Sequence, residues 1–228
     1  MTEGISVIIR CKDEERWIGY AVQSVIDFIP KNEIIVINNK SRDRSIEVIK
    51  SFRRDPDLRS NNENYTEIII QDVNDYSPGA VLNKGVELAN FEKILILSAH
   101  CVITHFDYSK LSQNLEKHAA IFGNQIPIYE GKKITKRYLW SHFCDSPVDN
   151  MYSESEDRYF FHNAASIFNK CILKQHKFNE NIVGKEDRYW ANNIVEVGKT
   201  YLYDPLNFCV EHHYLSLIHI SEPTRPSV

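Results

Sequence analysis

The sequence lacks the features that identify several broad classes of protein. It has no apolar run of ~18 residues, the length that a membrane-spanning helix needs. Its 27 Lys and Arg residues are outnumbered by 31 Asp and Glu residues, so it lacks the basic excess of a general nucleic-acid-binding protein. Its five cysteines are scattered, with no C-x-x-C pair, which indicates reduced thiols and a cytoplasmic location. Residues 1–6 are polar, and we expect no secretory signal there.

Three common catalytic motifs are also missing. No G-x-G-x-x-G is present, which argues against a dinucleotide-dependent oxidoreductase. No G-x-x-x-x-G-K-[ST] is present, so the chain is not predicted to be a P-loop NTPase. Without a G-x-S-x-G elbow, an α/β-hydrolase triad has no support either.

The first hundred residues alternate between two hydrophobic patterns. Short β-branched runs predict buried strands, and longer segments with apolar residues at helical spacing predict the helices between them. The predicted strands are 5–9, 34–37, 68–70 and 94–97, and the predicted helices are 17–26, 46–52 and 78–89. Because the connections are short, this alternation predicts an α/β fold with a largely parallel sheet.

The second half of the chain is less regular. It predicts strands at 119–122, 160–168, 200–203 and 208–210, and a helix at 186–197. The basic and aromatic stretch 130–140 predicts a loop, either a lid over an acceptor or a plain solvated segment. Residues 215–225 resemble the translation of a sequencing adapter, so we expect the tail 215–228 to be non-native.

Polar residues follow three of the predicted parallel strands, where such a sheet usually binds its ligand. These segments are 10–14, 38–41 and 98–100. Their side chains suit a nucleotide or a sugar.

Five short segments, in the same order, resemble motifs of family 2 glycosyltransferases. Ser6–Glu15 (SVIIRCKDEE) resembles the opening S-V-I-I-P-T-Y-N-E-E, and Ile35–Asp43 (IVINNKSRD) resembles the V-V-D-D-G-S-T-D loop. Ser77–Gly85 resembles the segment that ends in A-L-N-x-G, and Leu97–His100 (LSAH) falls where the family has L-D-x-D. Val183–Asp187 (VGKED) resembles the late G-x-E-D motif. The S-A-H variant resembles a rhamnosyltransferase-type subgroup.

The resemblance implies a fold and a domain plan. It implies the GT-A fold, a Rossmann-like, mostly parallel central sheet flanked by helices, with a smaller mixed acceptor-side region. One domain would span 1–214, with a nucleotide-sugar-binding half at 1–104 and an acceptor-side half at 105–214.

The resemblance also implies an activity. The expected reaction is inverting transfer of a hexose or deoxyhexose, such as rhamnose, from a nucleoside diphosphate to a saccharide or lipid-linked acceptor in bacterial surface polysaccharide synthesis. The expected location is cytoplasmic, and the sequence leaves peripheral contact with the inner face of the membrane open.

The resemblance assigns six positions to the donor. Cys11 and Asn39 would contact its base and ribose, although the family usually has Asp at the second position and Asn39 brings no charge. Arg10 and Lys84 would face the diphosphate. The full predicted donor-binding set is Arg10, Cys11, Glu14, Asn39, Lys84 and Ser98.

A divalent cation, Mg²⁺ or Mn²⁺, is expected because the family's D-x-D motif holds one against the donor diphosphate. Here Ser98 and His100 occupy those positions, so His100 either binds the metal or donates directly to phosphate; the plainer interpretation is a histidine that ends a strand. His212 and His213 lie where the family often has a histidine near the metal, although a pair of exposed loop histidines fits the sequence equally well.

Asp187 lies where the family has its catalytic base, and Glu186 would orient the base or the acceptor. The plainer interpretation is an acidic pair that the helix dipole favours in a first turn. Two other functions remain open: a non-catalytic nucleotide-sugar-binding relative, and a nucleotidyltransferase, for which the glycine-free loop 10–15 is a poor match.

Overall fold

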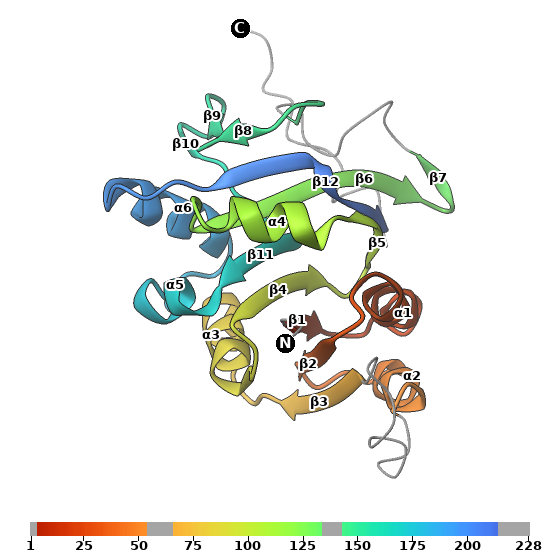
Figure 1. Ribbon diagram of the computed structural model, residues 1–228. Coiled ribbons are helices and arrows are strands. Elements are labelled where there is room, and N and C mark those ends of the chain that lie inside the picture. Colours follow the sequence, from red (N-terminus) through yellow and green to blue (C-terminus); the bar gives the residue numbers. More distant parts are fainter. Residues whose placement is uncertain (1–3, 54–65, 134–142, 214–228) are drawn as a thin grey trace, which may run out of the picture.

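A single long mixed sheet organises the protein (Figure 1). The structure is a computed structural model that describes residues 4–53, 66–133 and 143–213. Within these residues the strands of the sheet run in the order β3-β2-β1-β4-β11-β6-β12-β5, with β7 beside β6 and β8 beside β12. The strands are β1 (Ile5–Cys11), β2 (Asn32–Asn38), β3 (Thr66–Asp72), β4 (Lys93–Ser98), β5 (Cys101–Phe106), β6 (Ala120–Tyr129), β7 (Lys132–Lys133), β8 (Val148–Asp149), β9 (Tyr152–Ser153), β10 (Arg158–Tyr159), β11 (Ala165–Asn169) and β12 (Leu202–His213). The helices are α1 (Ile18–Phe28), α2 (Ser45–Ser51), α3 (Pro78–Leu88), α4 (Tyr108–Asn114), α5 (Lys170–Gln175) and α6 (Glu186–Glu196).

The first half confirms the predicted alternation of strands and helices. β1 pairs in parallel with β2 and β4, and β2 pairs in parallel with β3. Strands β1, β2 and β4 are aliphatic runs whose central residues are buried on both faces, as expected where helices cover both sides of a parallel sheet, whereas the edge strand β3 is only partly buried. Each strand extends beyond its predicted range, because the polar residues at its ends also pair with neighbouring strands.

Two helical layers enclose the sheet. Apolar residues of α1 and α2 pack with one face of β1 and β4, whereas those of α3, α5 and α6 pack with the other. Figure 1 shows α1 and α2 on one side of the strands and α3 and α5 on the opposite side. The second layer is rich in aromatic residues, and the fully buried Phe122 contacts the rings of Phe161 and Tyr203 at centroid distances of 5.0 and 5.1 Å.

The second half corrects several predictions. The two strands expected at 200–203 and 208–210 are parts of the single strand β12. The strand expected at 160–168 is β11, and it begins only at Ala165. The stretch 130–140 contains a strand, because Lys132 and Lys133 pair with β6; residues 134–140 lie outside the described part, as does the tail 215–228. The elements β5, α4 and α5 are not predicted from the sequence.

Helix α3 holds the segment that leads to α6. The Ser77 hydroxyl donates to the carbonyl of Glu180 at 2.5 Å. The Asn83 side chain donates to the carbonyl of Phe178 at 2.9 Å and accepts from its N–H at 3.1 Å. Gly79 packs so closely that an added Cβ would lie 2.3 Å from the Asn179 carbonyl oxygen. These contacts fasten the segment 178–180, six residues before Glu186, to the first half of the chain.

Candidate active site

The predicted donor-binding loops meet at the carboxyl ends of β1, β2 and β4. Cys11 pairs with Asn38, and Arg10 pairs with Ser98, so these positions share one edge of the sheet. The backbone N–H of Asn39 donates to the Cys11 carbonyl at 2.9 Å, which joins the first two loops directly. As expected for a parallel sheet, polar groups that are distant in sequence converge at this edge.

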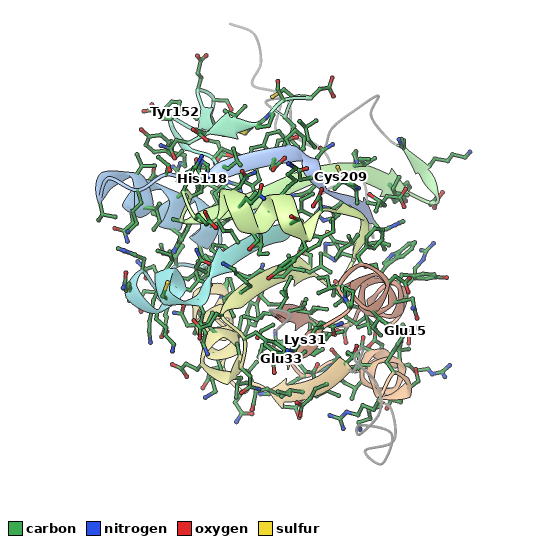
Figure 2. The ribbon with its side chains drawn as sticks, in the orientation of Figure 1. Glu15, Lys31, Glu33, His118, Tyr152 and Cys209 are labelled. Atoms are coloured by element: carbon green, nitrogen blue, oxygen red, sulfur yellow. The ribbon has the colours of Figure 1, made fainter. Side chains whose placement is uncertain are left out.

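The loop after β1 is braced against the start of α2. The Glu15 carboxylate accepts from the backbone N–H of Arg44 at 2.9 Å, and the Glu15 N–H donates to Asp43 at 2.9 Å. Figure 2 shows Glu15 where α1 and α2 approach each other. The Glu14 N–H donates to the buried Ser45 hydroxyl at 2.7 Å. The strand-end loops are therefore fixed in shape before any ligand binds.

Asp72 belongs to this edge although the sequence did not single it out. It ends β3, where its carboxylate accepts from the Asn38 side chain at 2.6 Å. Asp72 is exposed, whereas Asn38 is buried, and Asn39 is half-buried. The Asp72 carboxylate thus lies two strands from Cys11. It is on the side of the sheet edge where Asn39 lacks the family's negative charge.

Cys11 is a packing residue with a protonated thiol. It is 2% exposed, and burial raises the pKa of its thiol above the usual value. Its sulfur lies 3.7 Å from the Ser41 hydroxyl. A ligand could contact the edge of this thiol, but Cys11 is not set up as a nucleophile, because nucleophilic cysteines need a lowered pKa.

The acidic pair Glu186 and Asp187 begins α6, and both residues are 5% exposed. Asp187 Oδ2 accepts from the backbone N–H of Asn163 at 3.2 Å and from Arg188 Nη1 at 2.9 Å. Glu186 Oε1 accepts from Arg10 Nη1 at 2.8 Å and from the Asn163 side chain at 3.2 Å. Charge-assisted hydrogen bonds from cationic and N–H donors hold both buried carboxylates in a fixed position.

The Arg10 contact brings the two predicted halves of the site together. Arg10 lies on β1 and Glu186 on α6, 176 residues later. Arg10 Nη2 also lies 3.5 Å from Asn163 Oδ1. Asn163 and Arg188 were not identified from the sequence: Asn163 fell inside the predicted strand 160–168, and Arg188 inside the predicted helix 186–197.

Histidine rings gather on the other side of Ser98. His100 Nδ1 lies 2.9 Å from Glu14 Oε1, and the His100 ring stacks on that of His212 at a centroid distance of 4.9 Å. His212 Nδ1 lies 2.9 Å from the side-chain oxygen of Gln125. The second oxygen of Glu14 is buried with no hydrogen-bond partner among the described residues. The structure thus brings together two of the three predicted metal-binding histidines.

His213 has a different ring partner from that pair. Neighbouring residues on a strand point to opposite sides of the sheet, and the His213 ring stacks on Trp17 at a centroid distance of 4.0 Å. Burial lowers the pKa of His213, which indicates a neutral ring in a packed position. The backbone N–H of His213 donates to the His100 carbonyl at 2.9 Å, so its main chain supports the site.

Two other predicted donor-binding residues differ in their surroundings. Ser98 ends β4 and is half-buried, and its backbone N–H donates to the Ala164 carbonyl at 2.9 Å. Lys84 is exposed on α3 and forms an ion pair with Glu87 on the same helix at 3.5 Å. Its assignment to the donor diphosphate remains a prediction.

The histidine pair offers part of a cation site. In the described ranges, no group of three or more His, Cys, Asp or Glu side chains is arranged to hold a metal ion. Two imidazoles beside a buried carboxylate nevertheless fit a cation whose other ligands come from a bound molecule. Such nitrogen donors suit later transition metals such as Co²⁺ or Zn²⁺ better than Mg²⁺.

The profile of Glycosyl transferase family 2 matches residues 6–182, more than half of the chain. The chain belongs to this family. It is 31% identical over 102 residues to a poly-beta-1,6-N-acetyl-D-glucosamine synthase of Staphylococcus epidermidis, covering 44% of the chain and 23% of that protein. It is 26% identical over 195 residues to the GalNAc(5)-diNAcBac-PP-undecaprenol beta-1,3-glucosyltransferase of Campylobacter jejuni, covering 82% of the chain and 59% of that protein.

Solved structures show that this chain has the GT-A fold. S. aureus TarS 1–349 in complex with UDP superposes with a TM-score of 0.66 at 16% identity, covering 95% of this chain and 62% of that TarS chain. GalNAc-T7 with UDP, GalNAc and Mn²⁺ superposes with a TM-score of 0.65 at 16% identity, covering 93% and 44%. The chain thus spans less than two thirds of each of these relatives. No helix in its described part is long and apolar enough to cross a membrane.

Proposed function

We propose that this chain transfers a hexose or deoxyhexose, with inversion, from a nucleoside diphosphate to the hydroxyl of a saccharide or lipid-linked acceptor. The observation that carries the proposal is the contact between Arg10 on the donor-side strand and Glu186 in the acidic pair. It puts a potential base beside the sheet edge where the donor would bind. The curated relatives, whose names describe polysaccharide synthesis and a lipid-linked glycan, favour a role in bacterial surface polysaccharide synthesis.

The donor nucleotide would lie across the ends of β1, β2 and β3. Asn39 can hydrogen-bond a base or ribose but cannot supply charge. Asp72 supplies a carboxylate at the next strand end, and Cys11 forms the apolar floor. TarS binds UDP, as the name of its solved complex states. A uridine donor is therefore our first choice, with deoxythymidine second because of the resemblance to rhamnosyltransferases.

Asp187 would act as the general base. In the transfer step, the acceptor oxygen forms a bond to the anomeric carbon while the bond from that carbon to the diphosphate oxygen breaks. Asp187 takes the proton of the acceptor hydroxyl, and the nucleoside diphosphate leaves with the electron pair. Arg188 and Asn163 hold Asp187 in place, and Glu186 fixes Arg10 near the departing diphosphate.

His100 and His212 would hold a divalent cation, with Glu14 fixing His100 from behind. When bound, the cation would neutralise the negative charge that grows on the departing diphosphate. His213 is outside this proposed set, because its ring packs on Trp17.

A thermal-shift screen tests donor binding. UDP, dTDP, GDP and CMP would each be added with Mn²⁺, with Mg²⁺ or with EDTA. A ligand at a hundred times its Kd stabilises the folded state by ~2.7 kcal/mol, which is readily measured. We expect one nucleoside diphosphate to raise Tm with Mn²⁺ and to lose most of that effect in EDTA.

Two variants make the screen specific. Asn39→Ala should lose the nucleotide-dependent shift, whereas Gln113→Ala, at an exposed position on α4, should keep it. No shift with any nucleotide for the wild-type protein would contradict the proposal.

A non-catalytic nucleotide-sugar-binding protein is the second candidate. It is favoured by the neutral residues Asn38, Asn39 and Ser98, which stand where the family often has acidic ones. The buried acidic pair, held by hydrogen bonds beside the strand ends, favours catalysis instead. Release of nucleoside diphosphate from a sugar donor would exclude this candidate. Membership in the family likewise favours a glycosyltransferase over the nucleotidyltransferase alternative.

A further inference from the structure

A buried glutamine joins two histidines behind the strand-end site. Gln125 lies on β6, is fully buried, and reaches His212 on the adjacent strand β12. Its side-chain oxygen lies 2.9 Å from His212 Nδ1, and its side-chain nitrogen lies 3.1 Å from His162 Nδ1. A buried amide with both ends engaged fixes the direction of each hydrogen bond that it makes.

The contact between Ala164 and His162 sets the donor and acceptor of each hydrogen bond in this chain of contacts. The backbone N–H of Ala164 donates to His162 Nδ1 at 3.2 Å. Since a backbone N–H can only donate, His162 Nδ1 must be the unprotonated nitrogen. Gln125 must then direct its NH₂ group to His162 and its carbonyl oxygen to His212. His212 Nδ1 therefore carries a proton, and in the neutral ring Nε2 carries the electron pair.

The neighbouring histidine reaches the same state by a separate route. His100 Nδ1 lies 2.9 Å from a Glu14 carboxylate oxygen, which can only accept, so His100 Nδ1 also carries a proton. The His100 and His212 rings stack at 4.9 Å with 21° between their planes. In the neutral form of each ring, Nε2 therefore carries the electron pair, and a different residue holds each Nδ1–H from behind.

We propose that Gln125 is a positioning residue that, together with His162, holds His212 as the Nδ1–H tautomer and so prepares its Nε2 electron pair for a divalent cation. The role of Gln125 in cation binding rests on the proposed cation site, whereas the His212 tautomer follows from the hydrogen bonds alone. Residues behind a metal-binding histidine commonly fix its tautomer in this way, and replacing them typically weakens metal binding 10–100-fold.

Imidazole nitrogen spectra of the metal-free protein test the tautomer directly. Two-bond ¹H–¹⁵N correlations distinguish Nδ1–H, Nε2–H and doubly protonated rings, and a His212→Asn variant identifies the His212 signals. We expect the Nδ1–H pattern for His212 in the wild-type protein. Gln125→Leu should shift it toward Nε2–H, whereas Gln125→Glu should keep Nδ1–H because a carboxylate still accepts from it.

Ser166→Ala is the matched control. Ser166 is fully buried on β11, and its hydroxyl has no hydrogen-bond partner in the described residues. The Ser166→Ala variant should leave the His212 tautomer unchanged. If Gln125→Leu fails to fold, the spectra of the wild-type protein and of Gln125→Glu still test the predicted His212 tautomer. An Nε2–H pattern for His212 in the wild-type protein, or an unchanged pattern in folded Gln125→Leu, would overturn the proposal.

Titration with Co²⁺ in the presence of saturating UDP, whose diphosphate would supply the remaining ligands, then tests the purpose of this hydrogen-bonded arrangement. Gln125→Leu should weaken Co²⁺ binding roughly 10–100-fold, and Gln125→Glu and Ser166→Ala should stay within a few-fold of the wild-type protein. Equal Co²⁺ affinity in Gln125→Leu and wild type would overturn the proposed purpose. A wild-type protein with the expected tautomer but no Co²⁺ binding would overturn the cation site itself, which separates the two claims.

Discussion

The packing of Gly79 against the segment before α6 gives a sharp prediction for Gly79→Ala. The new Cβ would lie 2.3 Å from the Asn179 carbonyl oxygen and 2.8 Å from its carbonyl carbon. Both are backbone atoms, so no side-chain rotation can relieve the overlap. Ser77 also holds this segment, through its hydrogen bond to the Glu180 carbonyl. The segment must therefore move, and with it the loop that leads to the acidic pair.

The magnitude follows from two opposing terms. Overpacking of this kind costs typically 1–3 kcal/mol, and replacing a helical glycine by alanine recovers at most about 1 kcal/mol. We expect a net loss of about 1–2 kcal/mol in the free energy of unfolding. For a chain of this size, that lowers Tm by about 2–8 °C. Sugar transfer should fall further than the loss of folded protein explains, because the loop before Glu186 is displaced.

Gly19→Ala is the matched control, measured by the same thermal and denaturant unfolding. Gly19 lies within α1, and its added Cβ would approach side-chain atoms alone, Val48 Cγ1 at 3.1 Å and Phe52 Cε2 at 3.9 Å. Gly19→Ala should therefore leave Tm unchanged or raise it. The reasoning fails if Gly79→Ala is as stable as Gly19→Ala, or if Gly79→Ala is destabilised while its folded fraction transfers sugar at the wild-type rate.

Two further predictions concern residues at the site. At pH 8, iodoacetamide should label the exposed Cys171 first and Cys11 many times more slowly, because burial both shields the Cys11 thiol and raises its pKa. The labelling rate of Cys11 should keep rising above pH 8.5. Equal labelling rates for the two cysteines, measured by peptide mass spectrometry, would refute this prediction. Asn163→Asp would place a third carboxylate beside Glu186 and Asp187, so we expect a loss of several kcal/mol in the free energy of unfolding. This loss should be smallest at acidic pH, where the new carboxyl can be protonated. A denaturant midpoint equal to that of the wild-type protein at pH 7.5 would contradict this prediction.

The sequence predicted the first half of the fold well because local and tertiary preferences agree there. Val7, Ile8 and Ile9 are β-branched and lie in the centre of the sheet, so the local pattern matches the final environment. Pro78 occupies the first position of α3, where a proline is tolerated, so the start of this helix could be predicted from the sequence. The predicted convergence of the strand ends is also confirmed by the register of β1 with β2 and β4.

The second half depends on contacts that no local pattern contains. Asp204 accepts from the N–H groups of Leu206 and Asn207, which makes a turn within β12. The sequence on either side of this turn therefore has the pattern of two separate strands. β11 begins late because the N–H groups of Asn163 and Ala164 donate to the side chains of Asp187 and His162 rather than to a neighbouring strand.

The supporting residues of the site were missed for the same reason. Gln125 lies 87 residues from His212 and 37 from His162. Its burial follows from the pairing of β6 with β12, which the sequence did not predict. By contrast, Glu186 and Asp187 could be named from a motif, and their placement beside Arg10 came only from the structure.

The most direct test of the central claim compares the wild-type protein with Asp187→Asn. Both would be supplied with a nucleotide sugar that stabilises the fold, together with Mn²⁺ and a pool of saccharide and lipid-linked acceptors, and release of nucleoside diphosphate would be followed. We expect turnover by the wild-type protein and a loss of at least 10²-fold in Asp187→Asn, the size of a general-base contribution, with the thermal shift by the nucleotide retained. Wild-type turnover that persists in Asp187→Asn would contradict the assigned base, and no turnover by the wild-type protein with any bound donor would contradict the transferase itself.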